Sequence, residues 1–285
     1  MSAPSGVVPR LNFFADFLTV AWRSAAQLLR QPSHSRRAQA ARRLARHTLL
    51  VSATGAAAII ALMFVLDAPE IAMMPPRGTA SLWPLRILTD FGKDTYVLWG
   101  LAAGLIVVAL VSAGRHGIPR ARLLAFGTRL QYLFFAVAFS VLVASIVKWA
   151  AGRGRPFVGG KANPFNFEPF AGTEAYFSFP SAHAVTAFAL AFAVGAIWPR
   201  AKAWMYIYAV VIALTRLLLL AHHPSDVVAG ALIGVVGAMA VRYHFAARRL
   251  CFAIRSDGEI FPLAGPLFSR SKRVAKRVAR AAPAP

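Results

Sequence analysis

The sequence predicts an all-α fold, an integral membrane bundle of six transmembrane helices joined by short loops. Three observations lead to this prediction. Hydrophobic residues make up 58% of the 285 residues and charged residues 15%, which is far from the composition of a soluble domain. Six apolar stretches approach the length that crosses a bilayer. The basic residues accumulate in alternate connections between these stretches.

The six apolar stretches are the predicted spans. A bilayer core about 30 Å thick needs roughly 20 apolar residues per helix. The stretches cover residues 48–66, 96–113, 126–147, 183–198, 203–220 and 226–241. The fourth and sixth are short, so we expect them to be tilted or buried inside the bundle. Gly230 and Gly234 form a GxxxG pair in the sixth stretch, which we expect to pack against another helix of the same bundle.

The spans divide the chain into a basic N-terminal arm (residues 1–47), a six-helix membrane domain (48–241) and a basic C-terminal tail (242–285). The arm carries eight arginines ahead of the first span, which is typical of a retained signal anchor and not of a cleaved signal peptide. Within the arm, residues 11–30 mix aromatic and charged side chains, as in an interfacial helix or in a disordered arm. The tail either contacts anionic headgroups or is a solvated, unstructured end.

The charges of the connections predict the orientation. The N-terminal arm, the second and fourth connections and the C-terminal tail lie on one side of a six-helix arrangement and carry most of the lysines and arginines. Because these residues accumulate on the cytoplasmic side, we expect both termini to be cytoplasmic. The third connection, residues 148–182, breaks this rule because it carries four basic residues on the predicted outer side. Such an exception indicates a functional role.

Two kinds of function are disfavoured. The net charge of +22 would suit a nucleic-acid-binding protein, but such proteins carry their basic residues on a soluble domain. Here the basic residues flank apolar helices, so we expect no nucleic-acid partner. The single cysteine, Cys251, excludes an internal disulfide and a cysteine-based zinc site.

Three polar clusters interrupt the apolar chain, and the predicted orientation places all three on the outer side. The first is KWAAGRGRP, from Lys148 to Pro156, at the end of the third span. Its glycines and proline end the helix, so its cations converge on a short loop. The alternative is a cationic flank that extends to lipid headgroups. Arg153 is either a fourth cation of this site or a simple loop charge.

The second cluster, FPSAHAV at residues 179–185, has the residues of a helix start. Pro180 and Ser181 favour a helix that begins at the next residue. The unpaired N–H groups of its first turn then point outward at the positive end of the helix dipole, which is an arrangement that binds anions. His183 lies in that turn, where it reaches a bound anion or serves only as an interfacial residue.

The third cluster, RLLLLAHHPSD at residues 216–226, joins the fifth and sixth spans. Arg216 lies in an apolar segment, where a charge costs about 2.5–3.5 kcal/mol, so we expect it to face a polar cavity and an anionic partner. Pro224 disfavours helix at the preceding residue, and Asp226 is able to cap the next helix. Its carboxylate is then within reach of His222, where it would select one tautomer. Local geometry alone does not distinguish His222 from His223.

Together the clusters favour a site for a multiply charged oxyanion. Lys148, Arg155, Arg216 and the helix start supply positive charge, and phosphate is the natural ligand. Two histidines and an aspartate add a nucleophile and an acid. The outer clusters lack the several carboxylates that Mg²⁺ or a two-metal site requires, so we expect no metal and no cofactor.

The three clusters resemble, in order and spacing, the signature of the type 2 phosphatidic acid phosphatase (PAP2) superfamily, which includes the vanadium haloperoxidases. The family motifs are K-x6-RP, PSGH and SR-x5-H-x3-D. Here they read Lys148 with Arg155-Pro156, Pro180-Ser181-Ala182-His183, and Thr215-Arg216 with His222 and Asp226. The chain departs from the pattern twice, with Ala182 in place of glycine and Thr215 in place of serine. The alanine keeps the N–H donor but adds a methyl group that is able to crowd a ligand.

The resemblance implies a role for each matching residue. His222 would be the nucleophile that forms a phosphohistidine, Asp226 would orient it, and His183 would protonate the leaving oxygen. The phosphoryl oxygens would be bound by Lys148, Arg155, Ser181, the Ala182 N–H and Arg216. The family pattern leaves the position of His223 free.

The expected function is therefore that of a metal-independent lipid phosphatase at the periplasmic face of a bacterial inner membrane, with a lipid phosphate as substrate and membrane lipids around it. Candidate substrates are undecaprenyl pyrophosphate, phosphatidylglycerophosphate, phosphatidic acid and the phosphates of lipid A. The alternatives are a lipid phosphotransferase that uses the same histidine and a non-catalytic anion-binding membrane protein. A haloperoxidase is disfavoured because those enzymes are expected to be soluble. The sequence indicates no oligomeric state.

Overall fold

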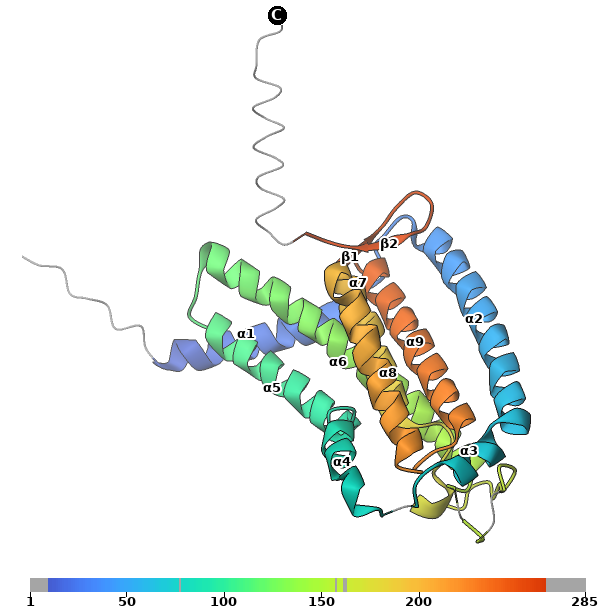
Figure 1. Ribbon diagram of the computed structural model, residues 1–285. Coiled ribbons are helices and arrows are strands. Elements are labelled where there is room, and N and C mark those ends of the chain that lie inside the picture. The colour runs from blue at the N-terminus through green and yellow to red at the C-terminus, as the bar shows by residue number, and fades with distance from the viewer. Residues whose placement is uncertain (1–9, 77, 157, 161–162, 265–285) are drawn as a thin grey trace, which may run out of the picture.

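A computed structural model describes residues 10–76, 78–156, 158–160 and 163–264 of the chain. These residues form a helical bundle with one small β hairpin (Figure 1). The long helices are α2 (Arg37–Val65), α5 (Asp94–Ser112), α6 (Gly117–Ala151), α7 (Ala182–Ile197), α8 (Lys202–Leu218) and α9 (Pro224–Ala247). Each overlaps one of the six predicted spans, so the all-α prediction is confirmed.

Five helical segments are long and apolar enough to cross a membrane, by length and composition, among the residues that the structure describes. They are Arg37–Val65, Ala80–Ser112, Gly117–Ala151, Pro199–Leu218 and Pro224–Ala247. The remaining predicted span corresponds to α7, which is apolar but has only 16 residues. At 1.5 Å per residue it is about 24 Å long, shorter than a typical bilayer core. The chain is therefore a multi-pass helical bundle in which the sixth span is not established by length.

Helix α7 lies in the centre of the bundle, against α6, α8 and α9, with α2 beside α9 at one edge and α5 at the other (Figure 1). The alternate small residues of α7 are fully buried. This agrees with the expectation that the short fourth stretch is tilted or buried inside the bundle. The two glycines of α9 make the contact with α7 possible. A Cβ atom on Gly230 would lie 2.5 Å from the carbonyl oxygen of Ser181, and one on Gly234 would lie 2.5 Å from that of Val185. The GxxxG pair is thus an intramolecular packing contact.

The segment that the sequence predicts as the connection between the first two spans, residues 66–95, is mostly helical. It contains helix α3 (Asp67–Met73), a 3₁₀ turn η1 (Ala80–Leu82) and helix α4 (Trp83–Asp90), which packs against α8. The other 3₁₀ turns are η2 (Glu174–Tyr176) and η3 (Pro199–Ala201). Both α3 and α4 lie at the end of the bundle where α6 ends and α7 begins (Figure 1).

The N-terminal arm contains helix α1 (Arg10–Leu29), so residues 10–29 adopt the helical alternative and not the disordered one. Its Asp16 pairs with Arg120 of α6 at 3.0 Å, and Gln27 donates to Gln131 of α6 at 2.8 Å. Aromatic side chains of α1 such as Phe14 and Trp22 stay exposed. Helix α1 is therefore an amphipathic helix held against the bundle.

The predicted domain boundaries at 48 and 241 fall inside helices, because α2 begins at Arg37 and α9 continues to Ala247. After α9, strands β1 (Phe252–Ile254) and β2 (Ile260–Pro262) form an antiparallel hairpin. Phe252 is fully buried against Tyr132 of α6, so this part of the predicted tail is folded against the bundle. The rest of the tail, residues 265–285, lies outside the described residues.

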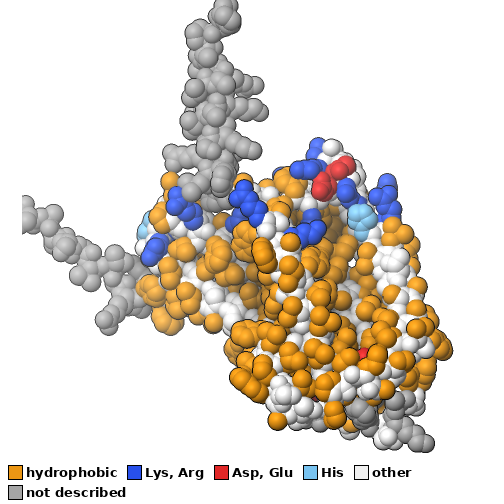
Figure 2. Space-filling model, viewed as in Figure 1, with side chains coloured by type: hydrophobic (Ala, Val, Ile, Leu, Met, Phe, Trp, Pro, Cys, Tyr) orange, Lys and Arg blue, Asp and Glu red, His pale blue; other side chains and the backbone are white. Residues whose placement is uncertain are grey.

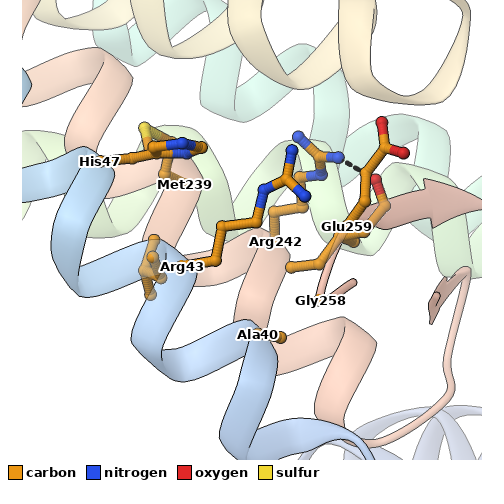
Figure 3. Close-up of a pocket in the computed structure, with 9 residues that line it drawn as sticks. Ala40, Arg43, His47, Met239, Arg242, Gly258 and Glu259 are labelled. Atoms are coloured by element: carbon orange, nitrogen blue, oxygen red, sulfur yellow. Dashed lines mark hydrogen bonds between the residues drawn. The ribbon is translucent and has the colours of Figure 1, made fainter. Parts of the chain in front are cut away.

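Basic side chains gather at the end of the bundle that carries the hairpin and the start of α2, whereas the flank is apolar (Figure 2). There Arg43 of α2, Arg242 of α9 and Glu259 beside β2 line a pocket of about 170 Å³ (Figure 3). Arg242 donates to the carbonyl oxygen of Ile260, and Arg43 pairs with Asp257 at 3.2 Å. These contacts hold the hairpin to α2 and α9. All three polar clusters of the sequence lie at the opposite end.

Candidate active site

The three predicted clusters meet at one end of the bundle. Lys148 is in the last turn of α6, Ser181 immediately precedes α7, and His222 lies between α8 and α9. Gly152 ends α6 with a left-handed conformation (φ 54°) in which a Cβ atom would meet the carbonyl oxygen of Glu168 at 1.8 Å. Only glycine fits this position, so the helix ends where the sequence predicts and the loop that follows turns back over the site.

His222 is the best-oriented side chain of the site. The ring is 3% exposed, and its Nδ1 atom lies 2.7 Å from the carbonyl oxygen of Ser178. Because a carbonyl oxygen only accepts, Nδ1 carries the proton and Nε2 keeps its lone pair. Burial lowers the pKa of the His222 imidazole to about 4, so the ring is neutral at neutral pH. The neutral ring with an unprotonated Nε2 is the form that acts as a nucleophile.

Asp226 contributes to this orientation less directly than the resemblance implies. Its Oδ2 atom is 3.8 Å from His222 Nδ1, which is beyond hydrogen-bond distance. The same oxygen accepts from Ser178 Oγ at 2.5 Å and from the backbone N–H of His223 at 2.9 Å. Asp226 therefore fixes the position of Ser178, whose carbonyl oxygen accepts from His222, and adds a negative charge near the imidazole.

Arg153 is neither a cation that faces the ligand nor a loop charge, the two alternatives that the sequence leaves open. The side chain is fully buried and pairs with Asp226 Oδ1 at 2.6 Å and with Asp67 Oδ2 at 2.8 Å. Its Nε and Nη2 atoms donate to the carbonyl oxygen of Pro164 at 3.0 and 2.6 Å. This guanidinium joins α3, the loop after α6 and the start of α9.

Asp67 completes the buried network from the start of α3. It accepts from the Ser225 N–H at 3.0 Å and from Ser225 Oγ at 2.5 Å, in addition to its ion pair with Arg153. The first turn of α9 is therefore capped by a carboxylate that comes from a distant part of the chain. With Asp226, two buried carboxylates therefore pair with one buried guanidinium.

The remaining predicted cations lie around the same region. Lys148 Nζ donates to the carbonyl oxygens of Phe177 and Pro180 at 2.8 and 2.9 Å, and so ties the end of α6 to the segment that precedes α7. Arg155 pairs with Glu174 at 2.8 Å. Arg216 donates to Thr89 Oγ1 of α4 at 2.9 Å. Arg155 and Arg216 line one pocket of about 300 Å³.

The start of α7 offers polar atoms to a ligand, as the second cluster predicts. The Oγ atom of Ser181 and the Nε2 atom of His183 are buried and have no hydrogen-bond partner within the described residues. Buried polar atoms are almost always paired, so these two are suited to an incoming group. The Ser181 N–H donates to the carbonyl oxygen of Asp226 at 3.0 Å, which links the second and third clusters directly.

Comparison with known proteins agrees with this arrangement. The family model described as the PAP2 superfamily matches residues 129–250, which contain all three motifs. The chain is 34% identical over 215 residues to the lipid A 1-phosphatase of Rhizobium johnstonii, an alignment that covers 74% of this chain and 85% of the relative. The chain belongs to the PAP2 superfamily. A second relative, the lipid A 1-phosphatase of Rhizobium etli, is 33% identical over 210 residues, covering 72% of this chain and 88% of the relative. No solved structure matches the chain significantly.

The expected PAP2-type lipid phosphatase is thus confirmed, as is a multi-pass membrane protein. Sequence reasoning missed several residues that the structure places at or near the candidate site: Asp67, Arg86, Thr89 and Ser178. Asp67 contacts Arg153 and Thr89 contacts Arg216, 86 and 127 positions away, so no local spacing reveals them. Ser178 lies two residues ahead of the PSAH motif, and its position there is the only sequence signal that points to it.

Proposed function

We propose that this PAP2 phosphatase hydrolyses a lipid A phosphate, the 1-phosphate of a phosphorylated glycolipid, at the periplasmic face of the inner membrane. Two relatives that are 34% and 33% identical to the chain over the aligned residues carry that activity in their names, which favours one of the four candidates that the sequence leaves open. The observation that carries the chemistry is the bond from His222 Nδ1 to the Ser178 carbonyl, because it leaves Nε2 as the reactive atom.

In the first step, His222 Nε2 attacks phosphorus as the bond between phosphorus and the lipid oxygen breaks. Protonated His183 gives its proton to that oxygen, and the lipid alcohol leaves. In the second step, neutral His183 takes a proton from water as the water oxygen attacks phosphorus, and phosphate departs from His222. Lys148, Arg155, Ser181, the Ala182 N–H and Arg216 bind the phosphoryl oxygens in both steps. The reaction consumes one water and needs no metal ion.

The architecture supports the proposed orientation. The site and the basic end lie at opposite ends of the bundle, and basic residues accumulate on the cytoplasmic side. Helix α7 runs from the site end to the basic end, between α6 and α8, and we count it as the sixth span (Figure 1). The basic segments 1–47 and 242–285 are then cytoplasmic, and the site is periplasmic.

The test is phosphate release by the purified protein in uncharged detergent. We expect release from lipid A in the presence of EDTA, inhibition by vanadate, and greater turnover of lipid A than of phosphatidic acid or undecaprenyl pyrophosphate. Vanadate forms a trigonal bipyramid like the transferring phosphoryl group, so it reports on the intact site. Activity that returns only when Mg²⁺ is added after chelation would contradict the metal-independent mechanism. Preference for another lipid would contradict the proposed substrate.

A further inference from the structure

A third arginine lies beside the two motif arginines in the pocket at the mouth of the site. Arg86, Arg155 and Arg216 line this pocket of about 300 Å³, and its apolar lining includes Leu82, Leu219 and Ala221. Arg86 belongs to none of the three motifs and comes from α4, in the connection between the first two spans. Neither histidine of the proposed mechanism lines the pocket, so it lies to the side of the reacting atoms.

Contacts of α4 with α8 and with the start of α7 hold Arg86 at this pocket. Thr89, one turn after Arg86, accepts a hydrogen bond from Arg216 Nη1 at 2.9 Å. Gly92, just beyond α4, packs so closely on α8 that a Cβ atom would lie 2.4 Å from Cγ2 of Ile212, and 3.5 Å from Cδ2 of His183. Helix α4 is therefore held against α8 and the start of α7, and Arg86 keeps its position relative to Arg216.

The positive charge around the pocket favours the binding of an anion. Arg86 is exposed and makes no hydrogen bond or ion pair with any residue that the structure describes. Arg155 has Glu174 as a partner, but that carboxylate is itself 84% exposed. Guanidinium groups around one cavity repel each other, and an anion between them removes that repulsion. The described residues that line the pocket thus include three guanidinium groups and no carboxylate.

The other side chains of α4 indicate where the ligand comes from. Trp83 and Ile87 are 62% and 54% exposed, and Phe91 just after the helix is 66% exposed. Aromatic and aliphatic side chains of this kind are typical of the boundary between bilayer and water. A lipid headgroup that enters the site from the bilayer therefore meets α4 and Arg86 before it reaches His222.

We propose that Arg86 binds a second anionic group of the substrate headgroup, next to the scissile phosphoryl group that Arg155 and Arg216 bind. This inference rests on the proposed function, since it assigns a specificity residue to the same site. Among substrates that share the same lipid anchor, the preferred one is then the one in which a second phosphoryl or carboxylate group lies beside the phosphate that is removed. A charge-assisted contact of this type is expected to change affinity about tenfold or more.

The first test measures binding and does not depend on turnover. Calorimetric titration of the purified protein with inorganic phosphate and with pyrophosphate compares one phosphoryl group with two. We expect pyrophosphate to bind more tightly, and the ratio of the two affinities to fall about tenfold in Arg86→Ala and less in Arg86→Lys. Arg200→Ala is the control, because Arg200 is an exposed arginine in η3 at the opposite end of α8. Its ratio is expected to equal that of the wild type.

The second test uses a matched pair of lipids, phosphatidic acid and diacylglycerol pyrophosphate. We expect Arg86→Ala to reduce kcat/KM for the diphosphate lipid about tenfold more than for the monophosphate lipid. Equal losses on both lipids, or equal losses of phosphate and pyrophosphate affinity, would overturn the proposal, because Arg86 would then act on the scissile group. Affinities and rates that are all unchanged in Arg86→Ala would also overturn the proposal. A wild-type protein that binds both anions selectively but hydrolyses no lipid would refute the proposed function and not the second anion site.

Discussion

The proton on His222 determines which atom of the ring reacts. Nδ1 donates to the Ser178 carbonyl at 2.7 Å, so the lone pair belongs to Nε2. His223, the next residue, does not bond to that carbonyl oxygen, and it precedes the first turn of α9 as its N-cap. Burial lowers the pKa of His223 as well, so it is a neutral ring enclosed by the protein. The two adjacent histidines therefore lie in different environments. The local sequence does not reveal this difference.

Substitution of the two histidines tests this assignment. His222→Ala is expected to abolish turnover and any phosphoenzyme trapped by acid quenching with labelled substrate, because every substrate passes through Nε2. His223→Ala is expected to retain most turnover but to lower the thermal unfolding midpoint, since its ring is 1% exposed and its removal leaves a cavity. Equal loss of phosphoenzyme in both variants would show that the nucleophile is misassigned.

His183 is tested by changing the leaving group. A general acid contributes roughly 10²–10⁴ in rate, and less when the leaving group departs readily as an anion. His183→Ala is therefore expected to reduce kcat/KM for phosphatidic acid far more than for nitrophenyl phosphate or a pyrophosphate. Vanadate inhibition measures whether the pocket still binds an anion. The same factor of loss on every leaving group would assign His183 to phosphate binding.

Asp67 acts through Arg153 and Ser225 and not on the substrate. Asp67→Asn removes one of the two carboxylates that pair with the buried Arg153 and leaves Asp226 as the other, so the expected cost is that of hydrogen bonds to a charged group, about 1.5–3 kcal/mol. We expect a lower unfolding midpoint and a reduced kcat with a smaller change in KM, because Asp226 and Ser178 lose their support. Asp257→Asn is the matched control, since that aspartate forms an exposed pair with Arg43 at the other end of the bundle. Unchanged kcat in Asp67→Asn would argue against a positioning role.

Helix α9 packs closely against α7 because Gly230 and Gly234 have no side chain. Gly230→Ala would place a Cβ atom 2.5 Å from the Ser181 carbonyl and 2.9 Å from Cβ of Ala184, so α9 must move away from the start of α7. We expect weaker vanadate inhibition and a lower unfolding midpoint. Gly100→Ala on α5 is the control, because a Cβ atom there meets nothing within 4 Å. Normal inhibition of Gly230→Ala would show that the anion site tolerates this shift.

The short helices α3 and α4 make the first connection part of the site. The sequence predicts only an outer segment with balanced charges there. Helix α3 supplies Asp67, and α4 supplies Thr89 to Arg216 and Arg86 to the pocket. Arg153, Arg155 and Arg216 are more than 60 positions away from these residues in the sequence, so the contribution of the connection to the site depends on tertiary packing.

At the scale of the whole molecule, the charge distribution predicts the topology. Fusion of a reporter that is active only outside the cytoplasm near Ala171, in the loop over the site, is expected to give signal. The same reporter fused after Pro285 is expected to give none, because the basic end is cytoplasmic. As a control, both fusion proteins must be present at full length and at similar levels. The reverse pattern would place the site on the cytoplasmic side and contradict a periplasmic phosphatase.

The sequence by itself determined the helices and the motif residues. Apolar stretches of nearly 20 residues specify helices in a bilayer because every backbone group must be satisfied internally. The x3 offset places Asp226 in the first turn of α9 behind His222, and Gly152 and Pro224 determine where helices end and begin. These are local properties, in which the residues that interact are close in the chain.

Only the tertiary structure decided the partners of those residues. The bond that orients His222 comes from Ser178, 44 residues away, and one of the two carboxylates that pair with Arg153 comes from Asp67, 86 residues away. Whether Arg153 faces the ligand or the interior depends on α3, and whether Arg86 reaches the pocket depends on how α4 packs against α8. Such contacts form between elements that are distant in the sequence and meet through side-chain packing, so no spacing within one segment specifies them.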